Sequence, residues 1–324
     1  MLQLPELGNY PTPVVRVAEL STEACSLWVK RDDLTHPLYG GNKVRKLGQL
    51  LADALRRGAE RVVTVGGVGS HHVLATATFA RLAGLRVDAA LFRQPHSPHV
   101  LETLRASLAQ GLGAFPVDSY AQAAGLLKAW QAQGAYVIPA GGSNHLGTLG
   151  IVDAMSELAQ QVRDGELPEP DLIVVPLGSG GTVAGLLAGI AVEGLRTRLL
   201  AVTVAQPSSV FERRAGALAQ ELVTQALRPQ LLQRLEIERS FIGAGYGHPT
   251  PAGQYAARAA AHSGVQLDDT YTAKAFAAAL SRVAQGHERT ILFWQTLSSA
   301  PLDPLLIGAP SQSEISPALC RLLL

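Results

Sequence analysis

Residues 172–187, LIVVPLGSGGTVAGLL, carry the clearest sign of the fold. The six apolar residues 172–177 predict a buried strand, and the glycines that follow predict a tight turn. Val183, Leu186 and Leu187 then recur at the spacing of one helix face. A strand joined to a helix by such a turn is the repeating unit of α/β proteins with a parallel sheet.

The same alternation continues on both sides of this stretch. Further strands are predicted over 61–65, 85–92, 114–117, 135–138 and 290–294. Helices are predicted over 47–55, 70–81, 182–192, 208–222 and 251–263. The polar, proline-rich residues 164–171 predict a linker between two such series. We therefore expect an α/β protein of two domains, each an open, twisted, mainly parallel sheet flanked by helices.

Composition narrows the class of protein. Of 324 residues, 47% are hydrophobic and 16% charged, which is typical of a well-buried globular chain. A net charge of +1 gives no reason to expect nucleic acid as a partner. Residues 1–6 lack a signal-peptide pattern, and no apolar run reaches the ~18 residues of a membrane span. The two cysteines, Cys25 and Cys320, have neither disulfide nor metal spacing. We expect a soluble cytoplasmic protein without a membrane partner.

Lys43 is the candidate covalent catalyst. It follows Gly40, Gly41 and Asn42, where a glycine-rich turn enters an amphipathic helix. A lysine amine becomes a nucleophile when burial or nearby cations keep it neutral. Arg45, Lys46 and the helix N-terminus are expected to supply that positive charge. The alternative is a solvated basic helix start.

The turn after the strand at 172–177 is a candidate phosphate site. Successive glycines let backbone N–H groups converge on an anion, and the following helix adds its N-terminal field. A P-loop is excluded because no Gly-Lys-Ser/Thr follows, and Val183 breaks the dinucleotide pattern. A single phosphate ester fits best, with a purely structural turn as the alternative. Such a site together with a reactive lysine suggests pyridoxal 5′-phosphate.

At this point the chain resembles a known family, the D-cysteine desulfhydrase and 1-aminocyclopropane-1-carboxylate deaminase branch of the fold type II pyridoxal-phosphate enzymes, which are tryptophan synthase β-like. The segments that carry the resemblance are residues 31–34, 39–47, 69–73, 141–147, 178–182, 245–251 and 267–275. They follow the family's order over nearly the whole chain. The resemblance implies a larger domain made of residues 1–52 and 162–324, a smaller inserted domain of residues 53–161, and a homodimer.

The resemblance also implies roles for individual residues. Lys43 would bind the cofactor as a Schiff base and then remove the Cα proton of the substrate. The implied catalytic residues are Lys43, Ser70, Tyr246 and Tyr271. The implied cofactor contacts are Lys43, Asn42, His71, Gly178, Ser179, Gly180, Gly181, Thr182, Thr272 and Thr296. The implied substrate contacts are Ser70, His71, His72, Tyr246 and Tyr271. For Ser70 a helix N-cap is an equally good interpretation. His71 and His72 are adjacent with no third ligand, so no metal is predicted.

Thr272 bears on the reaction. It would face the pyridine nitrogen of the cofactor, where the cyclopropane deaminases resemble one another in having glutamate. A hydroxyl there makes the cofactor a weaker electron sink, which favours substrates with a good leaving group. The expected reaction is α,β-elimination from a small β-substituted amino acid such as D-cysteine, giving pyruvate, ammonia and sulfide.

Two departures from the family leave other reactions open. The family usually has asparagine at the position of His71 and two glycines after the position of Thr296, where this chain has Leu297, Ser298 and Ser299. The alternatives with the same cofactor are ring-opening deamination of 1-aminocyclopropane-1-carboxylate, β-replacement and a specialised biosynthetic elimination. A catalytically inactive homologue with a binding or regulatory role is the alternative of another class.

Overall fold

The computed structural model describes residues 7–323, so residues 1–6, with their predicted lack of a signal peptide, and Leu324 lie outside it. Its strands form two sheets that are separated along the chain. The strands of the larger sheet, in spatial order, are β1 (Val14–Arg16), β2 (Ser26–Lys30), β10 (Thr290–Trp294), β7 (Leu172–Leu177), β8 (Arg198–Thr203) and β9 (Leu235–Glu238). The strands of the smaller sheet are β5 (Gly113–Pro116), β4 (Arg86–Phe92), β3 (Arg61–Gly67) and β6 (Tyr136–Val137).

Both sheets are almost entirely parallel. Only the edge pair β1 and β2 runs antiparallel among the pairs of the described chain. The α-helices are α1 (Asn42–Arg56), α2 (His71–Leu82), α3 (Pro98–Ala109), α4 (Tyr120–Ala132), α5 (His145–Arg163), α6 (Gly181–Val192), α7 (Ser208–Glu221), α8 (Arg228–Leu231), α9 (Pro251–His262), α10 (Thr272–Gln285) and α11 (Pro317–Cys320). Short 3-10 helices lie at Ala18–Leu20, Asp32–Leu34, Ala140–Gly142, Leu232–Arg234, Asp303–Leu306 and Gln312–Glu314.

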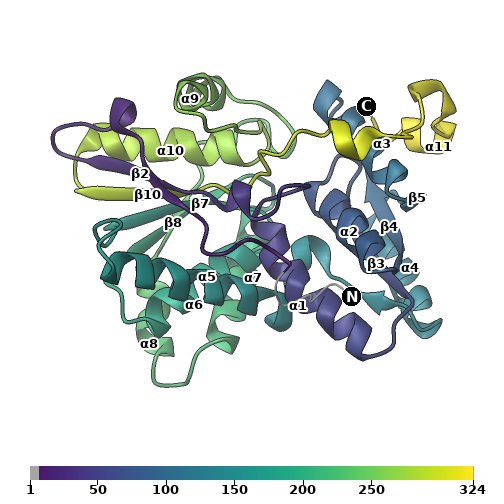
Figure 1. The fold of residues 1–324 in the computed structure, drawn as a ribbon, viewed down its shortest axis with the longest axis horizontal. Coiled ribbons are helices and arrows are strands. Elements are labelled where there is room, and N and C mark those ends of the chain that lie inside the picture. Colours follow the sequence, from purple (N-terminus) through teal and green to yellow (C-terminus); the bar gives the residue numbers. More distant parts are fainter. Residues whose placement is uncertain (1–6, 324) are drawn as a thin grey trace.

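Helices cover both faces of the larger sheet. Ile173 and Val175 of β7 pack with α5, α6 and α7, whereas Val174 between them packs with α9 and α10. Figure 1 shows these two helical layers on opposite sides of the strands. Because successive side chains of a strand point to opposite faces, a strand buried on both faces has to be apolar at every position. This is why residues 172–177 form a continuous apolar run.

The chain beyond β10 returns to the smaller sheet. Leu305, Ile315, Leu319 and Leu322 are buried in the same cluster as residues of α1, α2, β3 and β4. The Gln94 N–H also donates to the carbonyl oxygen of Leu322 at 3.0 Å. Figure 1 shows this C-terminal segment, in yellow, crossing from the larger sheet to the smaller one. The boundaries at 52/53 and 161/162 stay a prediction.

Most of the predicted elements are present. The strands at 172–177 and 290–294 have the predicted bounds, and the helices and the other strands start or end within a few residues of the predictions. The sequence did not predict β1, β2, β8, β9 or α10. The two-sheet, mainly parallel α/β architecture was predicted correctly.

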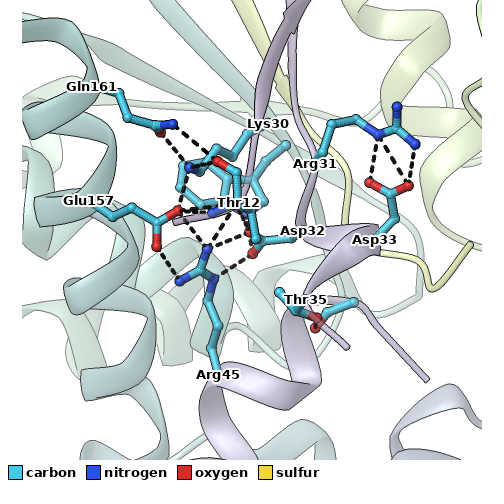
Figure 2. A network of polar contacts seen from close by, with 11 residues as sticks. Thr12, Lys30, Arg31, Asp32, Asp33, Thr35, Arg45, Glu157 and Gln161 are labelled. Atoms are coloured by element: carbon cyan, nitrogen blue, oxygen red, sulfur yellow. Dashed lines mark hydrogen bonds and ion pairs between the residues drawn. The ribbon is translucent and has the colours of Figure 1, made fainter. Parts of the chain in front are cut away.

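The start of α1 is anchored by a buried polar network, shown in Figure 2. The Arg45 guanidinium donates to Asp32 Oδ1 at 2.7 Å and to Glu157 Oε2 at 3.0 Å. Lys30 donates to Glu157 Oε1 at 2.5 Å, and Trp294 Nε1 donates to Asp32 Oδ2 at 2.7 Å. Burial alone would lower the pKa of Arg45, but the two carboxylates raise it, so the guanidinium stays charged. The network thus joins α1 to β2, α5 and β10.

We predict that Arg45→Met lowers the free energy of unfolding by about 3–5 kcal/mol, because it leaves buried carboxylates without their cation. Arg163→Met is the matched control, since that ion pair with Glu193 lies at the surface with the arginine side chain 54% exposed. It should cost about 1 kcal/mol or less. Urea denaturation followed by circular dichroism measures both. Equal losses for the two variants would show that the network does not anchor α1.

Candidate active site

One cavity of about 290 Å³ gathers most of the predicted site residues. It opens where parallel strands end: Gly67 ends β3, Gly178 follows β7, and Thr296 follows β10. Ligands of α/β proteins bind at these carboxyl ends. Among the predicted residues, those that line the cavity are Lys43, Asn42, Ser70, His71, His72, Gly178, Ser179, Gly180, Thr182, Tyr246, Tyr271 and Thr296. Gly181 and Thr272 do not line it.

Lys43 is held in the first turn of α1. The residue before that helix, Gly41, has φ of 94°, and a Cβ there would lie 2.7 Å from the Thr296 carbonyl oxygen. The Asn42 N–H donates to this same carbonyl at 3.2 Å. The Asn42 side chain accepts from Lys43 Nζ at 3.0 Å and donates to Thr182 Oγ1 at 2.8 Å. The amine is thereby tied to the glycine turn after β7.

Burial lowers the pKa of Lys43 to about 8, and Asp268 opposes this shift. The expected contribution of Arg45 is absent, because its guanidinium points away into the buried network with Asp32 and Glu157. Desolvation, not a neighbouring arginine, is therefore what makes the amine reactive near neutral pH.

The glycine turn forms an anion-binding concavity. Gly180 has φ of 94°, in the left-handed region, and α6 begins at the next residue. A Cβ on Gly181 would lie 2.4 Å from Ser143 Oγ and 2.8 Å from Lys46 Nζ. Only glycine therefore fits between this serine, this lysine and the start of α6. Backbone N–H groups at a helix N-terminus attract phosphate.

Lys46 is a functional residue that the sequence reasoning treated only as a nearby charge. It is 1% exposed, and its amine donates to the Gly141 carbonyl at 3.2 Å and to Ser143 Oγ at 3.4 Å. No ion pair to it occurs within residues 7–323. Burial, and then the charges of Lys43 and Arg214, lower its pKa well below the usual value. The spacing of three residues from Lys43, which places both on one helix face, was the signal for it.

Two tyrosines form the opposite wall. Tyr271 donates a hydrogen bond to Tyr246 at 3.0 Å, and their rings meet edge to face with centroids 5.5 Å apart. Burial raises the pKa of Tyr246 to about 12 and that of Tyr271 further, so both stay protonated. Lys274 fixes the loop before Tyr246 by donating to the carbonyls of Ile242 and Gly245.

Thr272 is not where it was expected. Its hydroxyl donates to Asp268 Oδ2 at 2.8 Å and accepts from the Asp268 N–H at 2.7 Å, so its hydrogen-bonding capacity is used at the start of α10. Thr296 instead presents a hydroxyl to the cavity, without a hydrogen bond to any described side chain. Asp268 also lines the cavity and accepts from the N–H groups of Tyr271 and Thr272.

The serine and the two histidines after β3 lie together. Ser70 caps α2 by accepting from the Val73 N–H at 3.4 Å, and it also lines the cavity, so both interpretations of this residue hold geometrically. Thr64 donates to the Ile138 carbonyl, which leaves its oxygen to accept from His72 Nε2 at 2.9 Å. His72 Nδ1 is therefore a buried acceptor without a partner among the described residues. His71 lines the same cavity.

Comparison with known proteins identifies the class. Residues 5–296 match the family described as pyridoxal-phosphate dependent enzyme, and the chain belongs to that family. It is 35% identical to the D-cysteine desulfhydrase of Klebsiella pneumoniae subsp. pneumoniae over 90% of this chain and 92% of that protein. It is also 35% identical to the D-cysteine desulfhydrase of Salmonella paratyphi A, over 86% of this chain and 88% of that protein. Family, fold class, cofactor and the class of pyridoxal-phosphate-dependent lyase were thus predicted correctly.

Solved structures agree with this assignment. A structure described as an ACC deaminase homologue superposes with a TM-score of 0.78 and 30% identity, covering 93% of this chain and 94% of that one. O-ureido-L-serine synthase superposes with a TM-score of 0.68 and 16% identity over 96% of both chains, which shows a shared fold only.

The residues present fit pyridoxal phosphate. A buried amine with a pKa of about 8 suits the aldehyde, and the glycine turn backed by the unpaired Lys46 suits the phosphate. Among the described residues, no helix is long and apolar enough to cross a bilayer, and no three potential metal ligands come together. Cys25 and Cys320 are both free thiols.

We predict that Gly181→Ala weakens pyridoxal phosphate binding at least about tenfold, which is about 1.4 kcal/mol. The added methyl would displace Ser143 or Lys46, which lie within 2.8 Å of its position. Gly125→Ala is the control, because Gly125 lies in the middle of α4 with no atom within 4 Å of such a methyl. Absorbance titration of cofactor-free protein gives both dissociation constants. Equal constants for the two variants would contradict the assignment of the turn.

We also predict how cofactor loading depends on pH. Only the neutral amine attacks an aldehyde, and the pKa of Lys43 is lowered to about 8. The loading rate should therefore rise about tenfold per pH unit below this value and level off above it, whereas an ordinary lysine has a pKa of about 10.4. Stopped-flow absorbance measures the rate, with N-acetyl-lysine as the reference amine. A rate that still rises up to about pH 10 would show that the amine is not desolvated.

Proposed function

We propose that this protein is a pyridoxal-phosphate-dependent lyase that catalyses α,β-elimination on a small β-substituted amino acid such as D-cysteine, giving pyruvate, ammonia and sulfide. The observation that carries the proposal is the desolvated Lys43 amine, tied through Asn42 to the glycine turn in a small cavity. The two relatives at 35% identity, both called D-cysteine desulfhydrase, support the choice of substrate.

The cofactor would be held at both ends. We propose that Lys43 binds it covalently and that the backbone of residues 178–182 holds the phosphate, with Lys46 as the cation behind the turn. Thr296 is the hydroxyl placed to face the ring nitrogen, since the hydroxyl of Thr272 is already bonded to Asp268. Thr272 then acts indirectly, by fixing Asp268 and the start of α10.

The chain's own residues then divide the chemistry. Pyridoxal phosphate supplies the electron withdrawal that acidifies the substrate Cα–H bond. The Lys43 amine takes the Cα proton, which its pKa of about 8 allows near neutral pH. Tyr246 and Tyr271 stay protonated and donate hydrogen bonds toward the leaving side of the substrate. Ser70 presents its hydroxyl at the start of α2, where a substrate carboxylate meets the helix N-terminus.

Ring-opening deamination is the second candidate. The structural similarity to an ACC deaminase homologue at a TM-score of 0.78 favours it, as does the presence of Ser70 and the tyrosine pair in one cavity. The ring-nitrogen partner argues against it, because a threonine hydroxyl stabilises less carbanion charge than a carboxylate.

We predict that the purified protein with pyridoxal phosphate releases sulfide and pyruvate in equal amounts from D-cysteine. The control is Lys43→Ala, which removes both the covalent contact and the base and should reduce the rate to background. L-cysteine and 1-aminocyclopropane-1-carboxylate are assayed alongside, the latter by the 2-oxobutanoate it would yield. Absence of products from D-cysteine would reject the lyase proposal, and 2-oxobutanoate would replace it with ring opening.

A cytoplasmic homodimer is proposed from the resemblance and from the cysteine usage alone. Size-exclusion chromatography with light scattering determines the oligomeric state.

A further inference from the structure

His71 stands in the wall between two cavities. A second cavity, of about 610 Å³, adjoins the one that holds Lys43. Tyr39 and His71 line both cavities, whereas His99 of α3 lines only the second and is exposed. A path from the catalytic cavity to the outer one therefore runs through these three side chains in order.

The three side chains are joined by hydrogen bonds. Tyr39 Oη lies 2.7 Å from His71 Nδ1, and His71 Nε2 lies 3.4 Å from His99 Nε2. The two imidazole rings have centroids 5.0 Å apart. A phenol and a neutral imidazole each donate one hydrogen bond and accept another, so this chain can be ordered in either direction. Both ring nitrogens of His71 are engaged in it, which leaves neither for a contact inside the catalytic cavity.

The charges around His71 keep it neutral. The groups that act on it are Lys43 of α1, His99 of α3 and Asp268 before α10. Burial lowers the pKa of His71 to about 4; Asp268 opposes the shift, and the two other groups reinforce it. Burial also raises the pKa of Tyr39. Neither group carries charge at neutral pH, so each passes a proton on instead of storing it.

We propose that Tyr39, His71 and His99 form a proton relay between the outer cavity and the catalytic cavity. The proposal rests on the lyase function proposed above, in which a thiolate leaves and needs a proton. Tyr246 and Tyr271 hold their protons tightly, since burial raises the pKa of both. A route that resupplies protons from solvent removes that obstacle.

The transfer balances atom by atom. A water O–H bond in the outer cavity breaks as His99 Nδ1–H forms, and the hydroxide is neutralised by the buffer. His99 Nε2–H breaks as His71 Nε2–H forms. His71 Nδ1–H breaks as a new Tyr39 O–H forms, and the former Tyr39 proton goes to the departing thiolate as an S–H bond. No atom is oxidised or reduced. The reverse transfer, outward, restores the starting tautomers.

The first test needs no turnover. Nitrogen NMR of ¹⁵N-histidine-labelled, cofactor-loaded protein reports the protonation and tautomer of His71. We expect His71 to stay neutral from about pH 5 to about pH 9, and we expect Tyr39→Phe and His99→Ala each to shift its tautomer equilibrium. His96→Ala is the control, because His96 is exposed and lines the same outer cavity without a hydrogen bond among the described residues. A His71 that titrates near its usual pKa of about 6.5, or that ignores both substitutions, overturns the relay.

The second test uses chemical rescue with D-cysteine as substrate. His99→Ala should lower kcat about 100-fold, at the lower end of the range for proton transfer, with KM unchanged. Added imidazole should restore the rate, because the missing side chain was exposed in the outer cavity. His96→Ala should match the wild type. Full activity of His99→Ala, or a loss that imidazole does not rescue, overturns the relay. Inactivity of the wild type rejects the lyase proposal instead, and the NMR result then decides the relay by itself.

Discussion

The position of the first turn of α1 is the constraint on which the site depends. Three cationic side chains leave this turn within four residues. Because a helix turns about 100° per residue, Arg45 points about 160° away from Lys43, while Lys46 lies only about 60° from it. Arg45 enters the buried network with Asp32 and Glu157, and the other two amines face the glycine turn. One helical turn therefore provides the anchor, the reactive amine and the buried cation together.

Charge balance explains why this arrangement suits a phosphate. Lys43 and Lys46 are both desolvated, and Asp268 is the one acidic residue among the described residues that line the cavity. An unpaired buried cation is unfavourable by several kcal/mol. A phosphate at the glycine turn supplies the missing counterion, and binding that favours only the folded chain stabilises it in proportion to ligand occupancy. The glycine turn and the lysine behind it thus work as one site.

The sequence predicted the elements whose local pattern is decisive. The run at 172–177 is apolar throughout because both faces of β7 are buried, and Lys43 stands out because glycines precede it. The role of Lys46 and the occupation of the Thr272 hydroxyl by Asp268 could not be predicted that way. Both depend on contacts between segments far apart in sequence: Lys46 meets Gly141 and Ser143, and Thr296 takes the position in the cavity that Thr272 was expected to fill. Spacing along one segment does not encode such contacts.

The departures from the family pattern fall on the wall of the cavity and leave the anchor intact. Ser298 Oγ accepts from the Gly40 N–H at 2.8 Å, and Ser299 Oγ donates to the Asp33 carbonyl at 3.4 Å. These serines bind the loop after β10 to the turn that precedes Lys43, which two glycines without side chains could not do. Leu297 and His71, by contrast, line both cavities. Substrate choice can therefore change at these two positions while the geometry around Lys43 is kept, which separates the conserved covalent chemistry from the variable part of the pocket.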